Sequence, residues 1–295
     1  MAGMLYLVAT PIGNLEDITL RAIRVLREAD LIACEDTRTS KARLGHYEIV
    51  TPVTSYHKFN EETKSRELVR RMLLGESVAL ITDAGMPAIS DPGETLVRCC
   101  ADAGVPVTAV PGASASVTAL ALSGADTRRF VFEGFLPGEN RERREVMDSL
   151  ADETRTIILY EAPHRLLRTL KVCAEVFGEE RKIVLLRELT KKFEEIHRTT
   201  IGGAAALYES GERTPRGEYV LVIDGKSKEE LKKEAAMSWE SMGLKEHVAL
   251  YESRGLDRKA AMKAVSQDRG ISKRDVYNAL MTKDQDIPCG PDNPQ

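Results

Sequence analysis

The stretch Val78–Glu94 constrains the fold of this chain more than any other part of the sequence. It opens with Val78–Thr82, a short apolar run typical of a buried strand. Small residues follow from Ala84 to Ser90, and Asp91–Glu94 has the composition of a helix start, with Asp91 as the N-cap. A strand that passes into a helix through such a loop predicts an open α/β sheet, whose ligands bind beyond the carboxyl ends of the strands. A plain strand–helix connection is the alternative, although long structureless loops usually carry a function.

The first 124 residues alternate apolar runs with amphipathic segments. We predict strands over Leu5–Ala9, Leu31–Cys34, Val78–Thr82 and Val105–Val110, and helices over Asp17–Ala29, Glu61–Leu74, Glu94–Ala103 and Ser114–Leu122. Strands that alternate with helices in this way form a largely parallel sheet. The polar stretch Asp126–Arg129 marks the end of this first α/β domain, which we place at residues 1–125.

Residues 126–225 predict a second domain with a different order of elements. Strands are expected over Phe130–Pro137, Thr156–Tyr160, Lys182–Arg187, Glu194–Thr200 and Glu218–Asp224. Helices are expected over Arg141–Leu150, from the residues after Arg165 to Phe177, and over Gly203–Ser210. We expect mixed strand directions, with the last two strands as hairpin-like partners around the short helix. The predicted fold class is therefore α/β, with a parallel sheet in the N-terminal domain and a mixed α+β sheet in the second.

The last seventy residues differ from the rest in charge. Residues 226–244 have the composition of a linker. Residues 245–281 predict a helix-turn-helix-like module of three short helices, Lys245–Arg254, Arg258–Gln267 and Lys273–Leu280. From Lys245 to Lys283, nine basic residues outnumber five acidic ones, which indicates contact with RNA or DNA. A packing or dimerisation appendage is the alternative, and residues 282–295 are expected to be disordered.

The bulk composition excludes some function classes. The net charge of −4 is not that of a protein binding polyanions over its whole surface, so nucleic acid must meet a local basic surface. The five cysteines have no metal-binding spacing, which predicts no metal site and reduced thiols in the cytoplasm. No apolar run approaches the roughly 20 residues of a membrane span, and we expect neither a signal peptide nor membrane attachment.

Polar residues after the second predicted strand are candidates for chemistry. Glu35, Asp36 and Arg38 could bind a substrate or act in acid–base catalysis, and a salt-bridged turn is the alternative. His57 lies in the segment Ser55–Asn60, between two aromatic residues and beside a lysine. It could serve as a base near neutral pH, or it could be an ordinary surface histidine. Aromatic residues in this segment could stack on nucleic-acid bases.

Longer blocks of the sequence carry a resemblance. They are Leu5–Ala22, Ala33–Ser40, Ile81–Gly93, Val110–Ala115, Phe132–Pro137 and Tyr160–Arg165. These blocks closely resemble signatures of the tetrapyrrole methylase superfamily, and within it of the branch that methylates small-subunit ribosomal RNA. The resemblance runs from about Met4 to Gly225, and the C-terminal helices are similar to a module found at the end of many members.

The resemblance implies a two-domain methyltransferase that binds S-adenosyl-L-methionine in the cleft between its domains. It implies a homodimer that methylates the ribose 2′-oxygen of cytidine 1402 in the decoding region of 16S rRNA, a component of the 30S ribosomal subunit. The residues expected to touch the cofactor are Ile12, Asp83, Met86, Ser114, Ala115 and Tyr160. The candidates for a general base are Glu35, Asp36 and His57, with Arg38 positioning a phosphate or carboxylate.

Substrate RNA is expected to meet the chain at several basic segments. These are Arg21/Arg24/Arg27, Arg38/Lys41/Arg43, Tyr56–Lys58, Lys191/Lys192 and the C-terminal module. Two other functions stay open. The same fold can methylate a tetrapyrrole or a modified amino-acid side chain, because fold alone does not determine the acceptor. A non-catalytic ribosome-binding factor would need no pocket for a small molecule.

Overall fold

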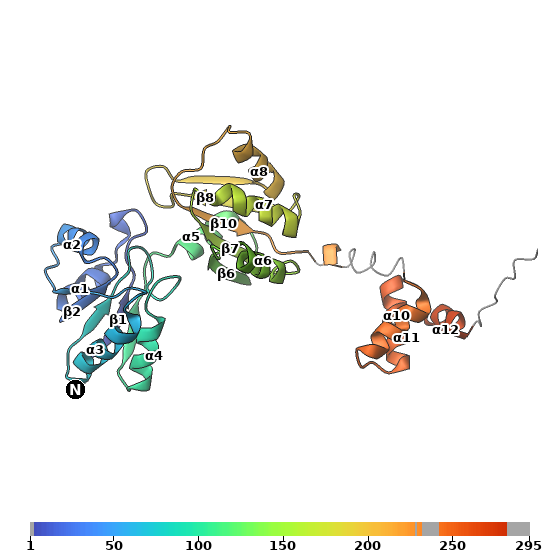
Figure 1. The fold of residues 1–295 in the computed structure, drawn as a ribbon, viewed down its shortest axis with the longest axis horizontal. Coiled ribbons are helices and arrows are strands. Elements are labelled where there is room, and N and C mark those ends of the chain that lie inside the picture. Colours follow the sequence, from blue (N-terminus) through green and yellow to red (C-terminus); the bar gives the residue numbers. More distant parts are fainter. Residues whose placement is uncertain (1–2, 228, 232–241, 282–295) are drawn as a thin grey trace, which may run out of the picture. The chain divides into compact units, whose positions relative to one another are not determined.

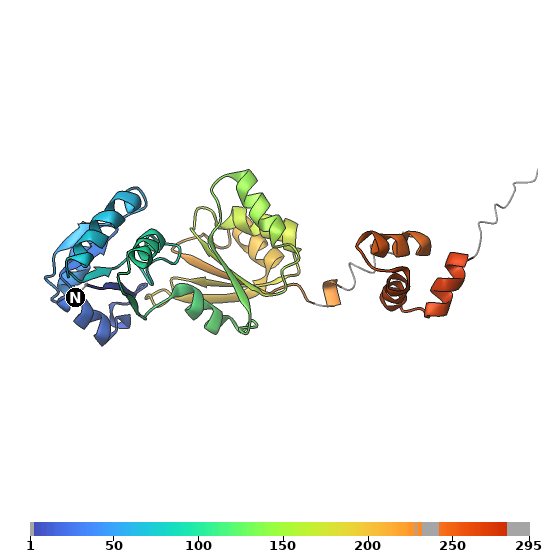
Figure 2. The same ribbon diagram turned by 90° about the horizontal axis from the view of Figure 1, so that it is seen from below.

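The computed structural model describes residues 3–227, 229–231 and 242–281, which belong to two separate compact units (Figures 1 and 2). The first unit ends at Gly225 and the second begins at Lys226. Most of the predicted linker at 226–244 and all of the predicted disordered tail at 282–295 lie outside the described residues.

The first unit begins with a five-stranded, fully parallel sheet in the order β3-β2-β4-β1-β5. Its strands are β1 (Leu5–Val8), β2 (Leu31–Cys34), β3 (Val53–Ser55), β4 (Val78–Leu80) and β5 (Val107–Val110). Its helices are α1 (Leu20–Glu28), α2 (Thr37–His46), α3 (Glu61–Leu73) and α4 (Glu94–Asp102), preceded by the 3₁₀ helix η1 (Leu15–Asp17). The predicted parallel sheet is confirmed, while α2 and the three-residue strand β3 were not predicted.

Helices cover both faces of this sheet. Val78 and Leu80 of β4 pack against Leu68 of α3 and other residues of α3 and α4, whereas Ala79 faces the layer that contains Val25 of α1. Successive residues of a strand point to opposite faces. Because both faces are covered, the strands are apolar at nearly every position, as in other buried parallel sheets.

Two helix starts differ from the prediction. Asp17 does not cap the first helix, because the chain forms η1 there and Thr19 becomes the N-cap of α1, accepting from the N–H of Ala22 at 3.0 Å. Asp91 does not cap α4 either. Its N-cap is Gly93, at a φ of 148°, and the N–H of Gly93 donates to Oε1 of Glu61 at 3.0 Å. The loop after β4 therefore continues to Gly93, and the Asp91 side chain is not used as a cap.

The second sheet has the order β6-β7-β10-β8-β9 and mixed strand directions, as predicted. Its strands are β6 (Phe130–Phe135), β7 (Thr156–Glu161), β8 (Lys182–Arg187), β9 (Glu195–Thr200) and β10 (Tyr219–Ile223). The helices α5 (Ala115–Ser123), α6 (Asn140–Ser149), α7 (Leu166–Phe177) and α8 (Ile201–Glu209) accompany them.

The predicted pairing of the last two strands is wrong, because β8 lies between β9 and β10. All five residues of β10 are buried and apolar or aromatic, so this strand occupies the centre of the sheet, where Leu221 is paired with both Leu159 and Leu185. The polar strand β9 takes an edge instead, where half-exposed side chains cost little.

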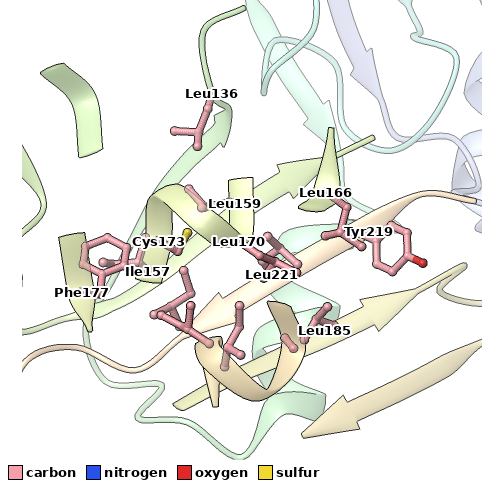
Figure 3. Close-up of a cluster of buried hydrophobic side chains, with 14 of the residues drawn as sticks. Leu136, Ile157, Leu159, Leu166, Leu170, Cys173, Phe177, Leu185, Tyr219 and Leu221 are labelled. Carbon is pink, nitrogen blue, oxygen red and sulfur yellow. The ribbon is translucent and has the colours of Figure 1, made fainter. Parts of the chain in front are cut away.

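Alternate residues of this second sheet pack against helices on opposite faces. Leu159, Leu185 and Leu221 face the core formed with α7 and α8 (Figure 3). Ile158 and Val222 face the other way, and pack with residues of α5. Although α5 precedes residue 125, the predicted end of the first domain, it covers the second sheet.

The second unit contains the three predicted helices, α10 (Leu244–Ser253), α11 (Arg258–Arg269) and α12 (Lys273–Met281). They enclose a small core of Val248, Ala261, Val265 and Val276. The start of α11 is capped by Asp257, which accepts from the N–H of Ala260 at 2.7 Å, and its end by the left-handed Gly270. Across residues 3–227, 229–231 and 242–281, every helix is too short or too polar to cross a bilayer.

Candidate functional site

A pocket of about 610 Å³ lies within the first unit. Its lining comes from the loops after β1, β2, β4 and β5 of the first sheet. The second sheet contributes β6, β7, β8 and β10 and the loops after β7 and β8. Its position matches the general rule that ligands bind at the carboxyl ends of parallel strands. The volume lies in the range of small-molecule and cofactor sites.

The structure brings together all six residues that the family resemblance assigns to a cofactor. Ile12 follows β1, Asp83 and Met86 follow β4, Ser114 and Ala115 lie at the start of α5, and Tyr160 lies near the end of β7; all six line the pocket. Of the four expected catalytic residues, only Glu35 lines it.

Asp36, Arg38 and His57 lie outside the pocket lining. Asp36 is the N-cap of α2, and its Oδ1 accepts from the N–H groups of Arg38 at 2.8 Å and Thr39 at 3.3 Å. These backbone hydrogen bonds hold the pKa of Asp36 below its usual value. In this structure Asp36 therefore caps a helix, and its expected catalytic role stays a prediction.

The other two residues are placed by local contacts. Arg38 is exposed on α2. The backbone N–H of His57 donates to Oδ1 of Asn60 at 2.9 Å, and its ring packs edge to face against Phe59, with 6.1 Å between ring centroids. Neither residue lines the pocket, and their expected place in the catalytic group stays a prediction.

The loop after β4 is joined to the first turn of the chain by backbone hydrogen bonds. Thr10 and Gly85 exchange N–H···O bonds of 2.9 and 3.0 Å, and the hydroxyl of Thr10 donates to the carbonyl of Thr82 at 3.1 Å. Gly85 has a φ of +78°, and an added Cβ would lie 3.4 Å from Cγ2 of Ile12. Glycine therefore allows this turn and keeps the backbone close to the pocket.

Backbone strain is concentrated beside the pocket. Of the five non-glycine residues with positive φ in the described ranges, Ala88 and Ser90 lie in the loop after β4, and Glu188 and Thr190 lie in the β8–β9 loop. Both loops contribute to the lining of the pocket. Such conformations persist only where the surroundings enforce them, and they are common at ligand sites.

Three carboxylates meet in the pocket. In the described part of the chain, the side chains of Glu35, Asp83 and Asp91 have no hydrogen-bond or ion-pair partner, and Oδ1 of Asp83 is buried. Burial, together with the nearby carboxylates of Glu35 and Asp83, raises the pKa of Asp91 to about 6. Burial and the charge of Asp83 also raise the pKa of Glu35. Unpaired carboxylates in one cavity favour a bound cation or a bound proton.

Tyr160 joins the two sheets at the pocket. Its hydroxyl accepts from the N–H of Ser116 on α5 at 3.0 Å, and burial raises its pKa. Its ring packs edge to face against Phe132 and Phe135, with centroid distances of 4.9 and 5.5 Å. These contacts fix the aromatic wall of the pocket.

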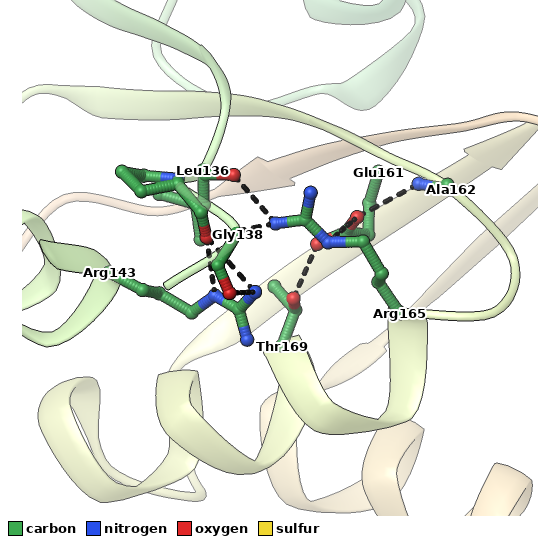
Figure 4. A network of polar contacts seen from close by, with 8 residues as sticks. Leu136, Gly138, Arg143, Glu161, Ala162, Arg165 and Thr169 are labelled. Atoms are coloured by element: carbon green, nitrogen blue, oxygen red, sulfur yellow. Dashed lines mark hydrogen bonds and ion pairs between the residues drawn. The ribbon is translucent and has the colours of Figure 1, made fainter. Parts of the chain in front are cut away.

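Two arginines hold the turn that follows Phe135 (Figure 4). Arg165 donates to the carbonyl of Leu136 at 2.6 Å, and the buried Arg143 donates to the carbonyl of Pro137 at 3.0 and 3.1 Å. Glu161 faces Arg165 at 3.4 Å and also accepts from the hydroxyl of Thr169. This network positions the wall of the pocket and leaves no free polar group of Glu161 for catalysis.

Sequence reasoning missed several residues that line the pocket. The clearest are Asp91 and His164, and Lys191 was expected only to contact RNA. Asp91 was assigned to a helix cap, and His164 was noted only within a motif. Lys191 lies between Glu188 at 3.0 Å and Glu218 at 2.8 Å, and an added Cβ on Gly13 would lie 2.4 Å from its Cγ. The signal for Lys191 is a contact between distant segments, which no local pattern contains.

A model of the tetrapyrrole (corrin/porphyrin) methylases matches residues 4–205. The chain belongs to the tetrapyrrole methylase family. This methylase is 46% identical over 276 residues to a protein of Halalkalibacterium halodurans named ribosomal RNA small subunit methyltransferase I, with 94% of each chain covered. A protein of the same name from Bacillus subtilis is 45% identical, with 95% of each chain covered.

Solved structures show the same fold at lower identity. A cobalt precorrin-4 methyltransferase covers 75% of this methylase and 94% of its own chain, with a TM-score of 0.55 and 20% identity. A diphthine synthase covers 76% of this methylase and 90% of its own chain, with a TM-score of 0.57 and 16% identity. These neighbours support the fold alone, since their identity is low.

The methyl donor of this methylase is S-adenosylmethionine. The pocket residues fit such a group. The buried Oδ1 of Asp83 has no partner in the described ranges and can accept from a ligand N–H or O–H. The small residues Ala84, Gly85 and Ala115 leave the backbone open on the pocket side. Among the described residues, no group of three or more His, Cys, Asp or Glu side chains is arranged to hold a metal ion.

Proposed function

We propose that this methylase transfers a methyl group to ribosomal RNA, and that the acceptor is the ribose 2′-oxygen of cytidine 1402 in the decoding region of 16S rRNA. The observation that carries the proposal is the near full-length similarity to bacterial proteins named ribosomal RNA small subunit methyltransferase I. It is supported by a pocket that gathers all six expected cofactor residues.

The cofactor would be held by the loops at the carboxyl ends of the parallel strands. The residues of this group near those loops are Ile12, Asp83, Met86, Ser114 and Ala115, and strand β7 of the second sheet adds Tyr160. S-adenosylmethionine, when bound, supplies a methyl group attached to a positively charged sulfur. The unpaired carboxylates of Glu35, Asp83 and Asp91 make the pocket favourable to positive charge, while Met86, Phe135 and Leu186 exclude water.

The main contribution of the residues to the rate would be positioning. Holding two reactants in the reacting geometry can supply about 7–11 kcal/mol of a barrier, provided that the site is rigid. Three sets of contacts provide that rigidity. They are the hydrogen bonds between Thr10 and Gly85, the bond from Ser116 to Tyr160, and the arginine network around Pro137.

Several side chains expected to contact RNA already have partners within the chain, among them Lys191, which is paired with Glu188 and Glu218. Arg24 is paired with Glu28 at 2.8 Å, Arg27 donates to the carbonyl of Tyr47 at 2.7 Å, and Arg43 donates to the carbonyl of Asp83. Tyr56 is also unavailable, because it is buried and contacts Ser65.

Exposed basic and aromatic side chains remain in the expected segments. They are Arg21, Arg38, Lys41, Lys58 and Lys192, with Phe59 at 94% and Phe193 at 66% exposure. Nζ of Lys192 lies 5.7 Å from the centroid of Phe193. Surfaces that bind single-stranded RNA commonly combine lysines with aromatic rings. The lysines contact phosphates, and the rings stack on bases.

The C-terminal module supplies a second basic surface. Arg258, Lys259 and Lys263 of α11 and Arg274 of α12 are exposed. We propose that these residues bind RNA phosphates and raise the affinity of the full chain for its substrate.

A homodimer is part of the proposal. The edge strand β5 exposes Val107, and the exposed apolar side chains Val117, Leu122 and Phe130 follow on α5 and β6. Sheet edges and exposed apolar side chains both favour association with another chain. Sedimentation at micromolar concentration should give twice the mass of the 32.6 kDa chain.

The proposal is tested with labelled cofactor and two acceptors, 30S subunits and naked 16S rRNA. After nuclease digestion, we expect the label in 2′-O-methylcytidine from a single site. If the label is found in a base, or if the RNA carries no label, the proposed acceptor is wrong. Transfer of the label to a tetrapyrrole or a modified amino acid would support those alternatives. A chain that binds 30S subunits but gives no heat with the cofactor in calorimetry supports the alternative of a non-catalytic ribosome-binding factor.

A shortened chain ending at Gly243 separates the two units in the same assay. We expect its affinity for RNA to fall about tenfold or more, because at least four phosphate-binding side chains are lost. Cofactor affinity should be unchanged, since the pocket lies within residues 3–225. Equal RNA affinity of the two chains would remove the module from the RNA-binding surface.

A further inference from the structure

Asp91 is a pocket residue to which neither the sequence nor the family resemblance assigned any chemistry. It lines the cavity, yet its carboxylate has no hydrogen bond or ion pair within the described ranges. This differs from Asp36, whose oxygen is bound by two backbone N–H groups. An acceptor oxygen in a ligand pocket without a protein donor is available to a bound substrate.

The loop fixes the position of Asp91 from both sides. On one side, Ser90 has a φ of 60°, and its hydroxyl would lie 2.6 Å from a Cβ added to Gly134 of β6. On the other side, the N–H of Gly93 donates to Glu61, and the carbonyl of Pro92 accepts from the N–H of Ala88 at 3.3 Å. The backbone that carries Asp91 is thus held where the first sheet meets the second.

The other polar groups of the pocket are mostly occupied. Glu161 is bound by Arg165, Thr169 and the N–H of Ala162. Lys191 lies between two carboxylates. The hydroxyl of Tyr160 accepts from Ser116. Four titratable side chains remain without partners in the described structure, namely Glu35, Asp83, Asp91 and His164.

These four differ in access and position. Oδ1 of Asp83 is buried at the end of its strand, among the residues expected to hold the cofactor. His164 is exposed at the second sheet, and no hydrogen bond orients its ring in the described structure. Glu35 and Asp91 are half-buried and face the same cavity. Asp91 is the one carried by the loop that touches both sheets.

We propose that Asp91 is the catalytic base that accepts the proton of the acceptor hydroxyl; this assignment rests on the proposed function. As the hydroxyl oxygen forms its bond to the methyl carbon, its proton passes to a carboxylate oxygen of Asp91, and the electron pair of the breaking carbon–sulfur bond stays on sulfur. Asp91 then gives the proton to water.

The electrostatics of the pocket support this role. Burial and the charges of Glu35 and Asp83 raise the pKa of Asp91 to about 6, close to the neutral range in which a general base is most effective. Other charged or titratable groups face the same cavity, namely Tyr160, Glu161, His164, Lys191, Glu218 and Tyr219, and Glu161 is held by Arg165 and Thr169. Lys191 and Glu218 are paired with each other, so the carboxylates of Glu35 and Asp83 are the unpaired charges beside Asp91.

The test compares Asp91→Asn with Glu35→Gln, Asp36→Asn and His164→Ala in single turnovers with saturating cofactor and 30S subunits. We expect Asp91→Asn to lower the transfer rate about 10²–10⁴-fold, while calorimetric cofactor affinity stays within about threefold. The wild-type rate should rise with pH up to about 6, and this limb should be absent from Asp91→Asn. Asp36→Asn should keep the rate within about threefold, whereas Glu35→Gln and His164→Ala, which change pocket residues, should lower it less than Asp91→Asn does.

A second readout does not depend on methyl transfer. Infrared spectra of the chain with ¹³C-labelled aspartate should show one carboxyl titrating near pH 6. This signal should be missing in Asp91→Asn and should move to lower pH in Glu35→Gln, since a neighbouring negative charge is removed.

The possible outcomes distinguish a failure of the assignment to Asp91 from a failure of the proposed function. A wild-type chain that methylates RNA while Asp91→Asn keeps its rate overturns the role of Asp91 and leaves the proposed function intact. Loss of rate only through weaker cofactor binding, or loss of rate in His164→Ala instead, overturns it as well. A wild-type chain that binds cofactor but methylates no RNA refutes the proposed function, and with it the proposed base.

Discussion

The loops after the neighbouring strands β2 and β4 begin alike and end differently. Each places a carboxylate soon after a buried parallel strand: Glu35 directly follows β2, and Asp83 comes shortly after β4, which ends at Leu80. After β2 the helix starts at once, and Asp36 is its N-cap. After β4 the chain continues to Gly93 before α4 begins, and Asp91 stays in the pocket.

The difference shows that the place where the following helix starts determines whether an acidic side chain caps that helix or stays available to a ligand. The first four N–H groups of a helix lack partners within it, and a nearby aspartate binds them. Gly93 leaves α4 without a side-chain cap, and the side chain of Glu61 on α3 accepts from its N–H instead. A contact between distant residues therefore leaves Asp91 free.

The largest expected effect on stability comes from substituting Gly93, the N-cap of α4 at which the loop after β4 ends. Gly93 has a φ of 148°, and an added Cβ would lie 2.9 Å from Cδ2 of Leu80. Gly93→Ala should therefore lower the free energy of unfolding by about 3 kcal/mol, combining backbone strain with overpacking. In urea denaturation, the matched control Gly104→Ala should cost about 1 kcal/mol, because Gly104 has a φ of 69° but open space around it. Equal losses would show that packing against Leu80 does not matter.

Asp91 should oppose folding once it is ionised. Its pKa in the folded chain is about 6, above the ordinary value of 3.8, so its stabilising effect is complete below pH 3.8 and is lost as the pH rises through 6. Asp91→Asn should raise the free energy of unfolding at pH 8 by about 1–2 kcal/mol relative to the wild type, with no gain at pH 3. Urea midpoints at the two pH values measure this difference, and a gain that does not depend on pH would contradict it.

Asp36 should show the opposite pH dependence and the smallest effect on activity. Because hydrogen bonds to the helix start lower its pKa, its stabilisation is present above pH 3.8 and is lost as the pH falls through the lower folded value. Asp36→Ala should lower the melting temperature at pH 7 but not in strong acid, and should leave the methyl-transfer rate within about threefold of the wild type. Asp36→Asn should retain the cap. A large loss of rate in both variants would return Asp36 to the list of catalytic residues.

Much of the fold could be predicted because its signals are local. Apolar runs such as Leu31–Cys34, and the three C-terminal helices with their glycine turns, need only their own sequence to be recognised. Weak local signals were missed, as with β3, which has three residues and no buried side chain. Among the candidate site residues, Glu35 and Asp83 line the pocket because they follow parallel strands, whose carboxyl ends lie at one edge of the sheet. Asp36 and Arg38 also follow a strand, but the start of α2 places them outside the lining.

The sequence by itself determined the parallel sheet, the mixed second sheet, the helical module and the family. Only the tertiary structure decided that β10 lies between β7 and β8, that α5 covers the second sheet, and that Asp91 rather than Asp36 faces the pocket. The reason is that these outcomes depend on contacts between distant residues, such as Gly93 with Glu61, 32 residues apart, and Tyr160 with Ser116, 44 apart. Local patterns describe which element forms, whereas the competition for partners across the fold determines which side chains remain free to act.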